Sequence, residues 1–128
     1  MIPRRLHFTW KSETLPPVMQ RYLDAWKRLH PDYEITLWTD ATMRAFVAEA
    51  WPELLGTYDA YPKMIQRADA FRYMVLGKLG GVYADLDVEP FQPIDDGAAL
   101  NRLEQWAGDA ATFKAILVDN PARLYDFA

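Results

Sequence analysis

Residues 67–89 read RADAFRYMVLGKLGGVYADLDVE, and this stretch decides the fold. From Met64, three residues before this stretch, to Leu79, apolar residues recur at steps of three and four. This spacing predicts a helix over about 63–79 with one buried stripe. The stripe consists of Met64, Ala68, Phe71, Val75 and Leu79. Gly80-Gly81 ends the helix, and the alternation from Val82 to Val88 predicts a strand that is closed by Pro90.

The residues before this stretch add strands and helices in alternation. Two further strands are predicted, over about 6–10 and 33–38, where β-forming residues alternate with polar ones. Helical spacing predicts a helix over about 17–29, and Thr39 or Asp40 is placed to cap another. The resulting order of strand, helix, strand, helix, helix and strand predicts an α/β domain with a mainly parallel sheet.

The chain is long enough for one small domain, since it has 128 residues. We expect residues 1–95 to form the α/β region and residues 96–128 to form a helical C-terminal tail. The N-terminus has no signal-peptide run, and no stretch reaches the roughly 18 apolar residues of a membrane span. The expected localisation is therefore cytoplasmic, with no membrane segment in this chain.

Charge and residue usage narrow the function. The formal net charge of −4 argues against a nucleic-acid binder, which usually carries a basic stripe. The chain has no cysteine, and its two histidines, His7 and His30, lie far apart, which argues against a zinc site. His7 is expected to pack or bond locally rather than to ligate a metal. Any metal would therefore be a hard cation with oxygen ligands, such as Mg²⁺, Mn²⁺ or Ca²⁺.

The acidic end of the quoted stretch is the strongest candidate for a metal site. On a strand, Tyr83, Asp85, Asp87 and Glu89 share one face. The carboxylates of Asp85, Asp87 and Glu89 repel one another, and a divalent cation would offset that repulsion. Residues two apart on a strand are about 6.6–6.8 Å apart, so one carboxylate can ligate the metal while another holds a hydroxyl or a metal-bound water. The alternative is an exposed edge strand whose charges deter aggregation.

Asp69 and Arg72 lie on one flank of the predicted helix, beside its apolar stripe. They form either an ordinary ion pair on a solvated face or a pair that binds hydroxyl and phosphate oxygens of a ligand. The helix leads directly through Gly80-Gly81 into the acidic strand, and glycine lets a chain approach a ligand closely. This arrangement favours the ligand-binding interpretation.

Residues 67–89 resemble the signature of the glycosyltransferase family that carries a DxD sugar-binding region. The family includes yeast-type α-1,6-mannosyltransferases and bacterial capsular polysaccharide transferases, and catalytic domains of large glucosylating toxins share the pattern. The segments 2–10 and 31–38 fit as well, so the resemblance covers about residues 2–95. It implies a GT-A fold, which is a Rossmann-like α/β domain that binds a nucleoside-diphosphate sugar.

The resemblance also implies roles for individual residues. Trp10 is expected to stack on or flank the nucleotide base, although a core aromatic is the alternative. Asp69 and Arg72 are expected to hold the donor sugar, and Tyr83 and Asp85 to contact ribose and sugar hydroxyls.

Asp87 is expected to ligate Mn²⁺ or Mg²⁺ that bridges the diphosphate. Asp85 and Asp87 are therefore the candidate catalytic residues. Glu89 is a weaker ligand candidate, because Pro90 follows it.

The function predicted from these features is metal-dependent transfer of a hexose from a UDP- or GDP-sugar to a carbohydrate or other hydroxyl acceptor. Such an enzyme takes part in polysaccharide biosynthesis. Because complete transferases of the family are much longer, we expect a truncated GT-A-like domain, and a truncated nucleotide-sugar and metal-binding module with little or no turnover is the first alternative. A carboxylate-metal hydrolase is a third hypothesis, and the absence of a histidine cluster weighs against it.

Overall fold

The computed structural model describes residues 2–94, 108–109 and 111–112. The chain divides into two compact units, Met1–Pro93 and Ile94–Ala128. The predicted helical tail over 96–128 lies almost entirely outside the described residues. No helix among the described residues is long and apolar enough to cross a membrane.

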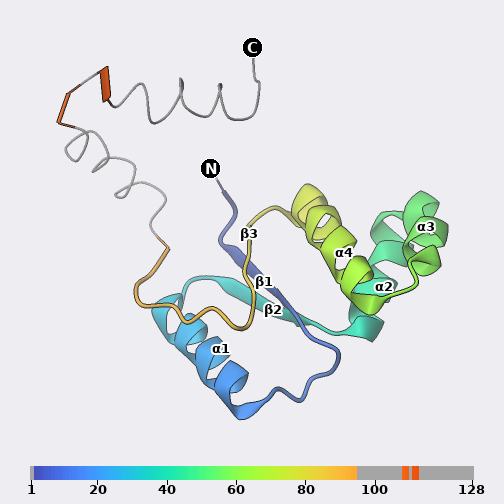
Figure 1. Ribbon diagram of the computed structural model, residues 1–128, viewed down its shortest axis with the longest axis horizontal. Coiled ribbons are helices and arrows are strands. Elements are labelled where there is room, and N and C mark those ends of the chain that lie inside the picture. The colour runs from blue at the N-terminus through green and yellow to red at the C-terminus, as the bar shows by residue number, and fades with distance from the viewer. Residues whose placement is uncertain (1, 95–107, 110, 113–128) are drawn as a thin grey trace. The chain divides into compact units, whose positions relative to one another are not determined.

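A parallel sheet lies at the centre of the first unit (Figure 1). Its strands are β1 (Arg5–Thr9), β2 (Glu34–Trp38) and β3 (Val82–Tyr83), in the order β2-β1-β3. Both neighbours of β1 run parallel to it. The predicted α/β class with a parallel sheet is therefore confirmed, and β1 is the central strand.

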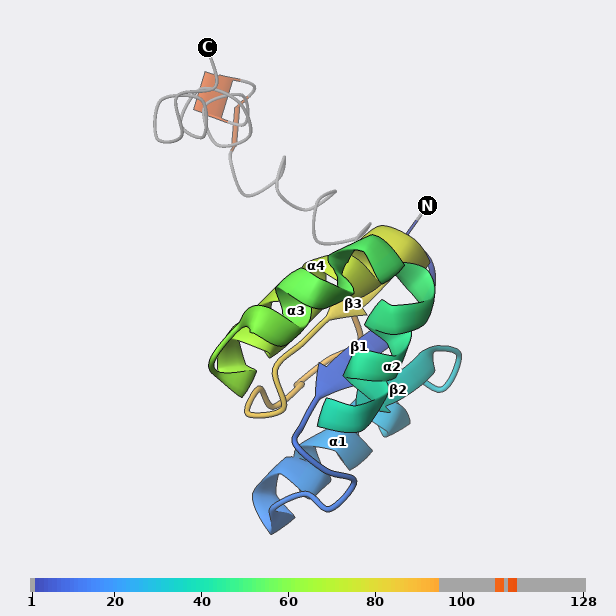
Figure 2. The same ribbon diagram turned by 90° about the vertical axis from the view of Figure 1, so that its right-hand side faces the viewer.

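Helices cover both faces of this sheet. They are α1 (Pro17–Leu29), α2 (Asp40–Ala50), the short 3-10 helix η1 (Pro52–Leu54), α3 (Leu55–Ala60) and α4 (Met64–Leu79). Figures 1 and 2 show α1 on one face and α2, α3 and α4 on the other. The cap of α2 is Thr39, whose hydroxyl accepts a hydrogen bond of 3.3 Å from the Thr42 backbone N–H.

Side chains of β1 and β2 pack against the helices on the two faces of the sheet. Leu6 and Phe8 are fully buried, and the Phe8 ring centre lies 5.6 Å from that of Trp26 on α1. On the opposite face, the Trp38 ring centre lies 5.2 Å from that of Phe71 on α4. A buried cluster on that face joins α2, α3 and α4, and consists of Met43, Val47, Tyr58, Phe71 and Val75.

The predicted buried stripe of α4 is correct in its middle and wrong at its start. Phe71 and Val75 are fully buried, but Met64 is 38% exposed. Met64 begins the helix, and its side chain lies in the wall of a surface cavity instead of the core. The side chain of Met64 is therefore available to a ligand.

The third strand is shorter than the alternation predicts. It ends at Tyr83, and the Val88 N–H donates to the Asp85 carbonyl at 3.2 Å, which closes a tight turn. Leu86 is consequently buried, whereas Val88 is 47% exposed. Aspartate favours turns over strands, because its side chain competes for backbone hydrogen bonds. The extended acidic strand over 82–88 was therefore a wrong prediction.

The imidazole of His7 connects the three parts of the chain that meet at the sheet. The Trp38 indole N–H donates to His7 Nδ1 at 3.2 Å, and His7 Nε2 lies 2.9 Å from the Gly80 carbonyl. A carbonyl only accepts, so Nε2 carries the proton and Nδ1 does not. His7 is thus a neutral, locally bonded histidine, as the sequence predicted.

Glycine is required at the turn between α4 and β3. Gly81 has a φ of 95°, and a Cβ there would lie 2.6 Å from the carbonyl oxygen of Arg5. Gly80 has a φ of 66°, and its Cβ would meet the ring of Pro3. The glycine pair therefore lets the turn pack against β1 and the residues before it. The expected close approach of this turn to a ligand stays a prediction.

We predict that Gly81→Ala destabilises the fold by about 1–3 kcal/mol, because alanine would be strained at positive φ and would collide with the Arg5 carbonyl. Gly56→Ala is the matched control, since a Cβ at this exposed helical position meets no atom within 4 Å. That control should be neutral or slightly stabilising. Urea unfolding followed by tryptophan fluorescence measures both, and equal midpoints for the two variants would contradict the packing role of Gly81.

We predict that the free energy of unfolding falls as the pH drops from about 7.5 to 5.5. Burial lowers the pKa of His7 from its ordinary 6.5, outweighing the hydrogen bond to Gly80. The unfolded chain therefore takes up a proton before the folded chain does. Stability is complete above the unfolded pKa and declines as the pH falls below it. His7→Gln, compared by urea unfolding at several pH values, should lack this decline; an unchanged slope would assign it to another group.

Candidate donor-binding site

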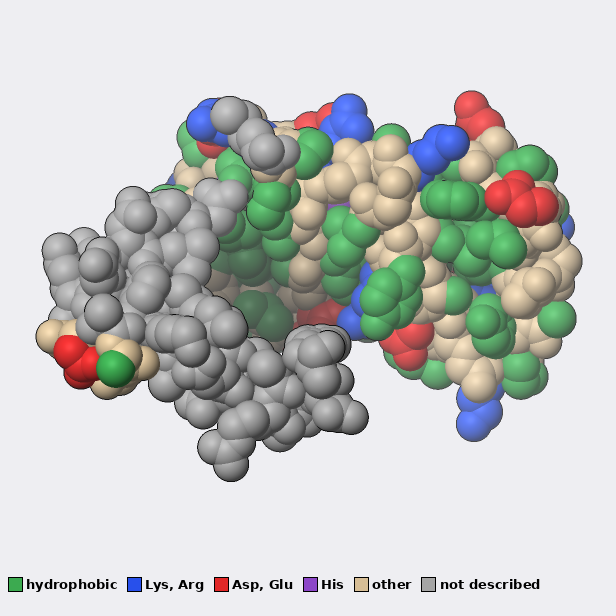
Figure 3. All heavy atoms as spheres, turned by 90° about the horizontal axis from the view of Figure 1, so that it is seen from above, with side chains coloured by type: hydrophobic (Ala, Val, Ile, Leu, Met, Phe, Trp, Pro, Cys, Tyr) green, Lys and Arg blue, Asp and Glu red, His purple; other side chains and the backbone are tan. Residues whose placement is uncertain are grey.

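A cavity of about 410 Å³ opens beside the carboxyl ends of β1 and β3. Ligands of parallel α/β sheets bind at this edge, where the loops after neighbouring strands converge. Segments from four parts of the chain line the cavity: Thr9, Trp10, Lys11 and Met19; Asp40 and Met43; Met64, Ile65, Ala68 and Arg72; and Tyr83, Asp85, Leu86 and Asp87. On the face drawn in Figure 3, acidic and basic side chains of the described residues are interspersed among apolar ones.

Five of the six residues predicted to bind donor or metal line this cavity. They are Trp10, Arg72, Tyr83, Asp85 and Asp87. The sixth, Asp69, lies beside the cavity and contacts it through Arg72. The fold thus brings together residues that are up to 77 positions apart, counted from Trp10 to Asp87. Their individual roles stay predictions.

Arg72 is the central cation of the site. Its Nη2 donates to Asp69 Oδ1 at 3.1 Å and lies 3.8 Å from Asp85 Oδ1. Its guanidinium carbon lies 4.7 Å from the centre of the Tyr83 ring, a favourable cation–π distance. Its Nε is buried and has no hydrogen-bond partner in the described part of the chain. Arg72 therefore holds two carboxylates in place and keeps one donor unused.

The hydroxyl of Tyr83 is already engaged within the protein. It lies 2.6 Å from the hydroxyl of Thr9, and either oxygen can donate. Tyr83 and Thr9 come from adjacent strands, and together they support the ring on which Arg72 rests. Thr9 was missing from the sequence-based site. In the sequence, the one indication that Thr9 belongs to the site was its position next to Trp10, near the end of the first predicted strand.

The turn after β3 displays the two acidic residues. Leu86 is buried between them, whereas Asp85 and Asp87 are exposed and both line the cavity. The Trp26 indole donates to the Val88 carbonyl at 3.1 Å and anchors the end of the turn to α1. The predicted shared orientation of the two carboxylates therefore arises from an anchored turn, not from strand alternation. Glu89 is exposed and does not line the cavity.

The oxygen atoms of Asp85 and Asp87 fit a hard divalent cation. Among residues 2–94 and the four described residues beyond them, no group of three or more His, Asp or Glu side chains could hold a metal by itself. Mg²⁺-type ions commonly take only one or two protein carboxylates and complete their shell with phosphate and water. The donor set is therefore incomplete for a purely structural metal and suited to one that binds together with a phosphate ligand.

Trp10 forms part of the cavity wall at the end of β1. It is partly buried, and its indole N–H is a buried donor without a partner among the described residues. A tryptophan used only for packing commonly finds a partner for this donor. The apolar walls of the cavity include Met64 and Ile65, which the sequence did not single out as ligand-binding.

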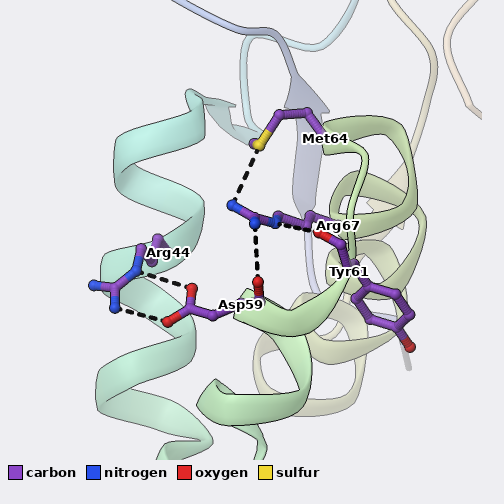
Figure 4. A network of polar contacts seen from close by, with 5 residues as sticks. All are labelled: Arg44, Asp59, Tyr61, Met64 and Arg67. Carbon is purple, nitrogen blue, oxygen red and sulfur yellow. Dashed lines mark hydrogen bonds and ion pairs between the residues drawn. The ribbon is translucent and has the colours of Figure 1, made fainter.

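Arg67, the first residue of the quoted stretch, acts on the fold and not on the cavity (Figure 4). Its guanidinium donates to the carbonyls of Asp59 and Tyr61 at 2.9 and 3.2 Å and so caps the end of α3. Asp59 in turn accepts two hydrogen bonds from Arg44, at 3.0 and 2.8 Å. Arg67 also contacts the sulfur of Met64, 3.6 Å away. This network positions the first turn of α4.

Known proteins are similar to this chain over much of its length. The model of the family described as "Glycosyltransferase sugar-binding region containing DXD motif" matches residues 16–108. Inositol phosphoceramide mannosyltransferase 3 of Schizosaccharomyces pombe is 49% identical over 90 residues, which cover 68% of this chain and 24% of that protein. Mannosyl phosphorylinositol ceramide synthase SUR1 of Saccharomyces cerevisiae is 42% identical over 87 residues, covering 68% of this chain and 23% of that protein.

A more distant relative is the initiation-specific alpha-1,6-mannosyltransferase of Candida albicans. It is 30% identical over 101 residues, which cover 73% of this chain and 26% of that protein. The chain thus spans about a quarter of the length of the curated relatives it matches. No solved structure matches it significantly.

The family match extends over more than half of the chain and includes both Asp85 and Asp87. The helix-flanked parallel sheet is consistent with the GT-A-like α/β domain that the sequence predicted. The chain therefore belongs to the family of glycosyltransferase sugar-binding regions that contain a DXD motif.

Proposed function

We propose that this chain is the donor-binding region of a metal-dependent mannosyltransferase, which transfers mannose from a GDP- or UDP-sugar to a hydroxyl acceptor. One observation carries the proposal: Trp10, Arg72, Asp85 and Asp87 line a single cavity at the carboxyl edge of the sheet. The relatives named above as mannosyltransferases support mannose as the sugar.

In this proposal, the two ends of the donor contact different sides of the cavity. The indole of Trp10, which lines the cavity, offers a flat surface to the nucleotide base. Asp69 and Arg72 bind hydroxyls of the sugar, Asp69 as acceptor and Arg72 as donor. Tyr83 orients Arg72 through its ring, and its hydroxyl is bonded to Thr9. This role stands beside the contact with ribose that the sequence suggested for Tyr83, since a hydroxyl in one hydrogen bond can still form another.

Charge explains why a metal is needed. Asp40, Asp85 and Asp87 line the cavity with only Lys11 and Arg72 as cations, so a diphosphate would enter a site that already carries excess negative charge. We propose that Asp87, with Asp85 beside it, holds Mn²⁺ or Mg²⁺. A divalent cation there would act as a Lewis acid that offsets the charge on the leaving diphosphate.

The acceptor is proposed to be a carbohydrate or another hydroxyl compound. Two of the relatives are named for inositol phosphoceramide or its mannosylated product, and another for an alpha-1,6-mannosyl linkage. An acceptor with an inositol or mannose hydroxyl is consistent with these names. A second candidate function, which the sequence left open, is binding of donor and metal with little turnover.

We predict that GDP-mannose or UDP-glucose quenches the intrinsic tryptophan fluorescence saturably, and only when Mn²⁺ is present. Trp10 is the expected reporter, so Trp10→Phe should bind the donor more weakly and lose most of the signal change. Release of the free hexose of whichever donor binds, or its transfer to a mannoside acceptor, then separates an active transferase from a binding module. A folded chain that responds to neither donor with Mn²⁺ would overturn the proposed function.

We predict that Asp87→Asn lowers Mn²⁺-dependent donor affinity at least about tenfold, because a neutral amide is a much poorer ligand for a hard cation. Glu89→Gln is the matched control, since it removes one negative charge two residues away and outside the cavity. Isothermal titration calorimetry with donor and Mn²⁺ measures both variants. Wild-type affinity in Asp87→Asn would show that the metal lies elsewhere.

A further inference from the structure

We infer that Lys11 contacts the diphosphate of the donor directly, an inference that rests on the proposed function. Lys11 follows Trp10 at the carboxyl end of β1, and it lines the cavity together with Asp85 and Asp87. β1 is the central strand of the sheet, so the loop after it lies where phosphate-bearing ligands of parallel sheets bind.

The availability of its charge distinguishes Lys11 from the other cation of the cavity. Arg72 is committed to Asp69 and Asp85, at 3.1 and 3.8 Å. None of the ion pairs among the described residues includes Lys11, and its side chain is exposed. A diphosphate that enters the cavity therefore meets one uncommitted cation. Lysine suits this role, because its ammonium is a point charge on a flexible stem and can follow either phosphate.

The position beside Trp10 also sets the order of contacts along the ligand. If the Trp10 indole flanks the base, the Cα atom of Lys11 lies only about 3.8 Å from that of Trp10, because the two residues are adjacent in the chain. Lys11 is then close to the part of the ligand that follows the base. The two acidic residues line the same cavity from the turn after β3. Lys11 and a metal held by Asp87 would then neutralise the diphosphate from two separate segments of the chain.

The test compares a ligand with phosphates and one without. The 128-residue chain is titrated, with Mn²⁺, with GDP and guanosine and in parallel with UDP and uridine. The variants are Lys11→Ala, Lys11→Arg and, as a charge-matched control, Lys27→Ala, which removes an exposed lysine in the last turn of α1 that does not line the cavity. Circular dichroism verifies that each variant is folded.

The expected result is a loss of about tenfold or more in affinity for the nucleoside diphosphate in Lys11→Ala, with affinity for the nucleoside unchanged. Lys11→Arg should retain most of the affinity, and Lys27→Ala all of it. Wild-type diphosphate affinity in Lys11→Ala, or an equal loss for nucleoside and diphosphate, would overturn the inference. No binding of either diphosphate by the folded wild type would overturn the proposed function, and the inference with it.

Discussion

The two hydrogen bonds of the His7 imidazole hold together the segments on which the site depends. Its neutral ring accepts from Trp38 in β2 and donates to Gly80 in the turn before β3. The His7 side chain is buried, and leaving one of its nitrogens unpaired there would cost about 1–3 kcal/mol. Protonation of Nδ1 would turn the acceptor into a second donor facing the Trp38 indole. The geometry of the carboxyl edge is therefore tied to one protonation state of one side chain.

The packing of Gly81 against β1 is the second condition for the site. Only a residue without Cβ lets the turn lie so close to the Arg5 carbonyl, and that closeness brings Tyr83 next to His7 and Thr9. The chain then leaves the sheet, and burial of Leu86 turns both aspartates outward. Backbone approach and apolar burial thus determine where the carboxylates lie, before any ligand is involved.

Electrostatics in the cavity are balanced only in part by the protein. Arg72 offsets Asp69 and Asp85, while its position is maintained by the Tyr83 ring beneath it. Asp40 and Asp87 have no ion-pair partner among the described residues. In the proposed function, such an excess of negative charge disfavours a bare diphosphate and favours one that arrives with a divalent cation. The proposed role of Lys11 rests on the same charge balance.

Prediction from sequence worked where the signal is local. The helix predicted over 17–29 matches α1, and the spacing around Phe71 and Val75 located α4. Both predictions succeeded because helical periodicity depends on residues only three and four positions apart. The extended strand to Val88 was wrong, because period-two alternation does not reveal where sheet pairing ends. Met64 was placed in the core for a similar reason: periodicity identifies a face of a helix but not how far the core extends along it.

The sequence by itself determined the α/β class, the order of the strands and of the helices α1, α2 and α4, and the family, since each depends on short-range pattern or on a contiguous motif. Only the tertiary structure decided which parts of that motif face the cavity. Arg67 caps α3 while Arg72 reaches the site, although both lie on one helix. Thr9, Lys11 and Asp40 joined the site only because the fold brings the end of β1, the start of α2 and the turn after β3 to one cavity. Contacts between distant segments depend on strand order and register, and these are settled by burial and hydrogen bonding across the whole sheet.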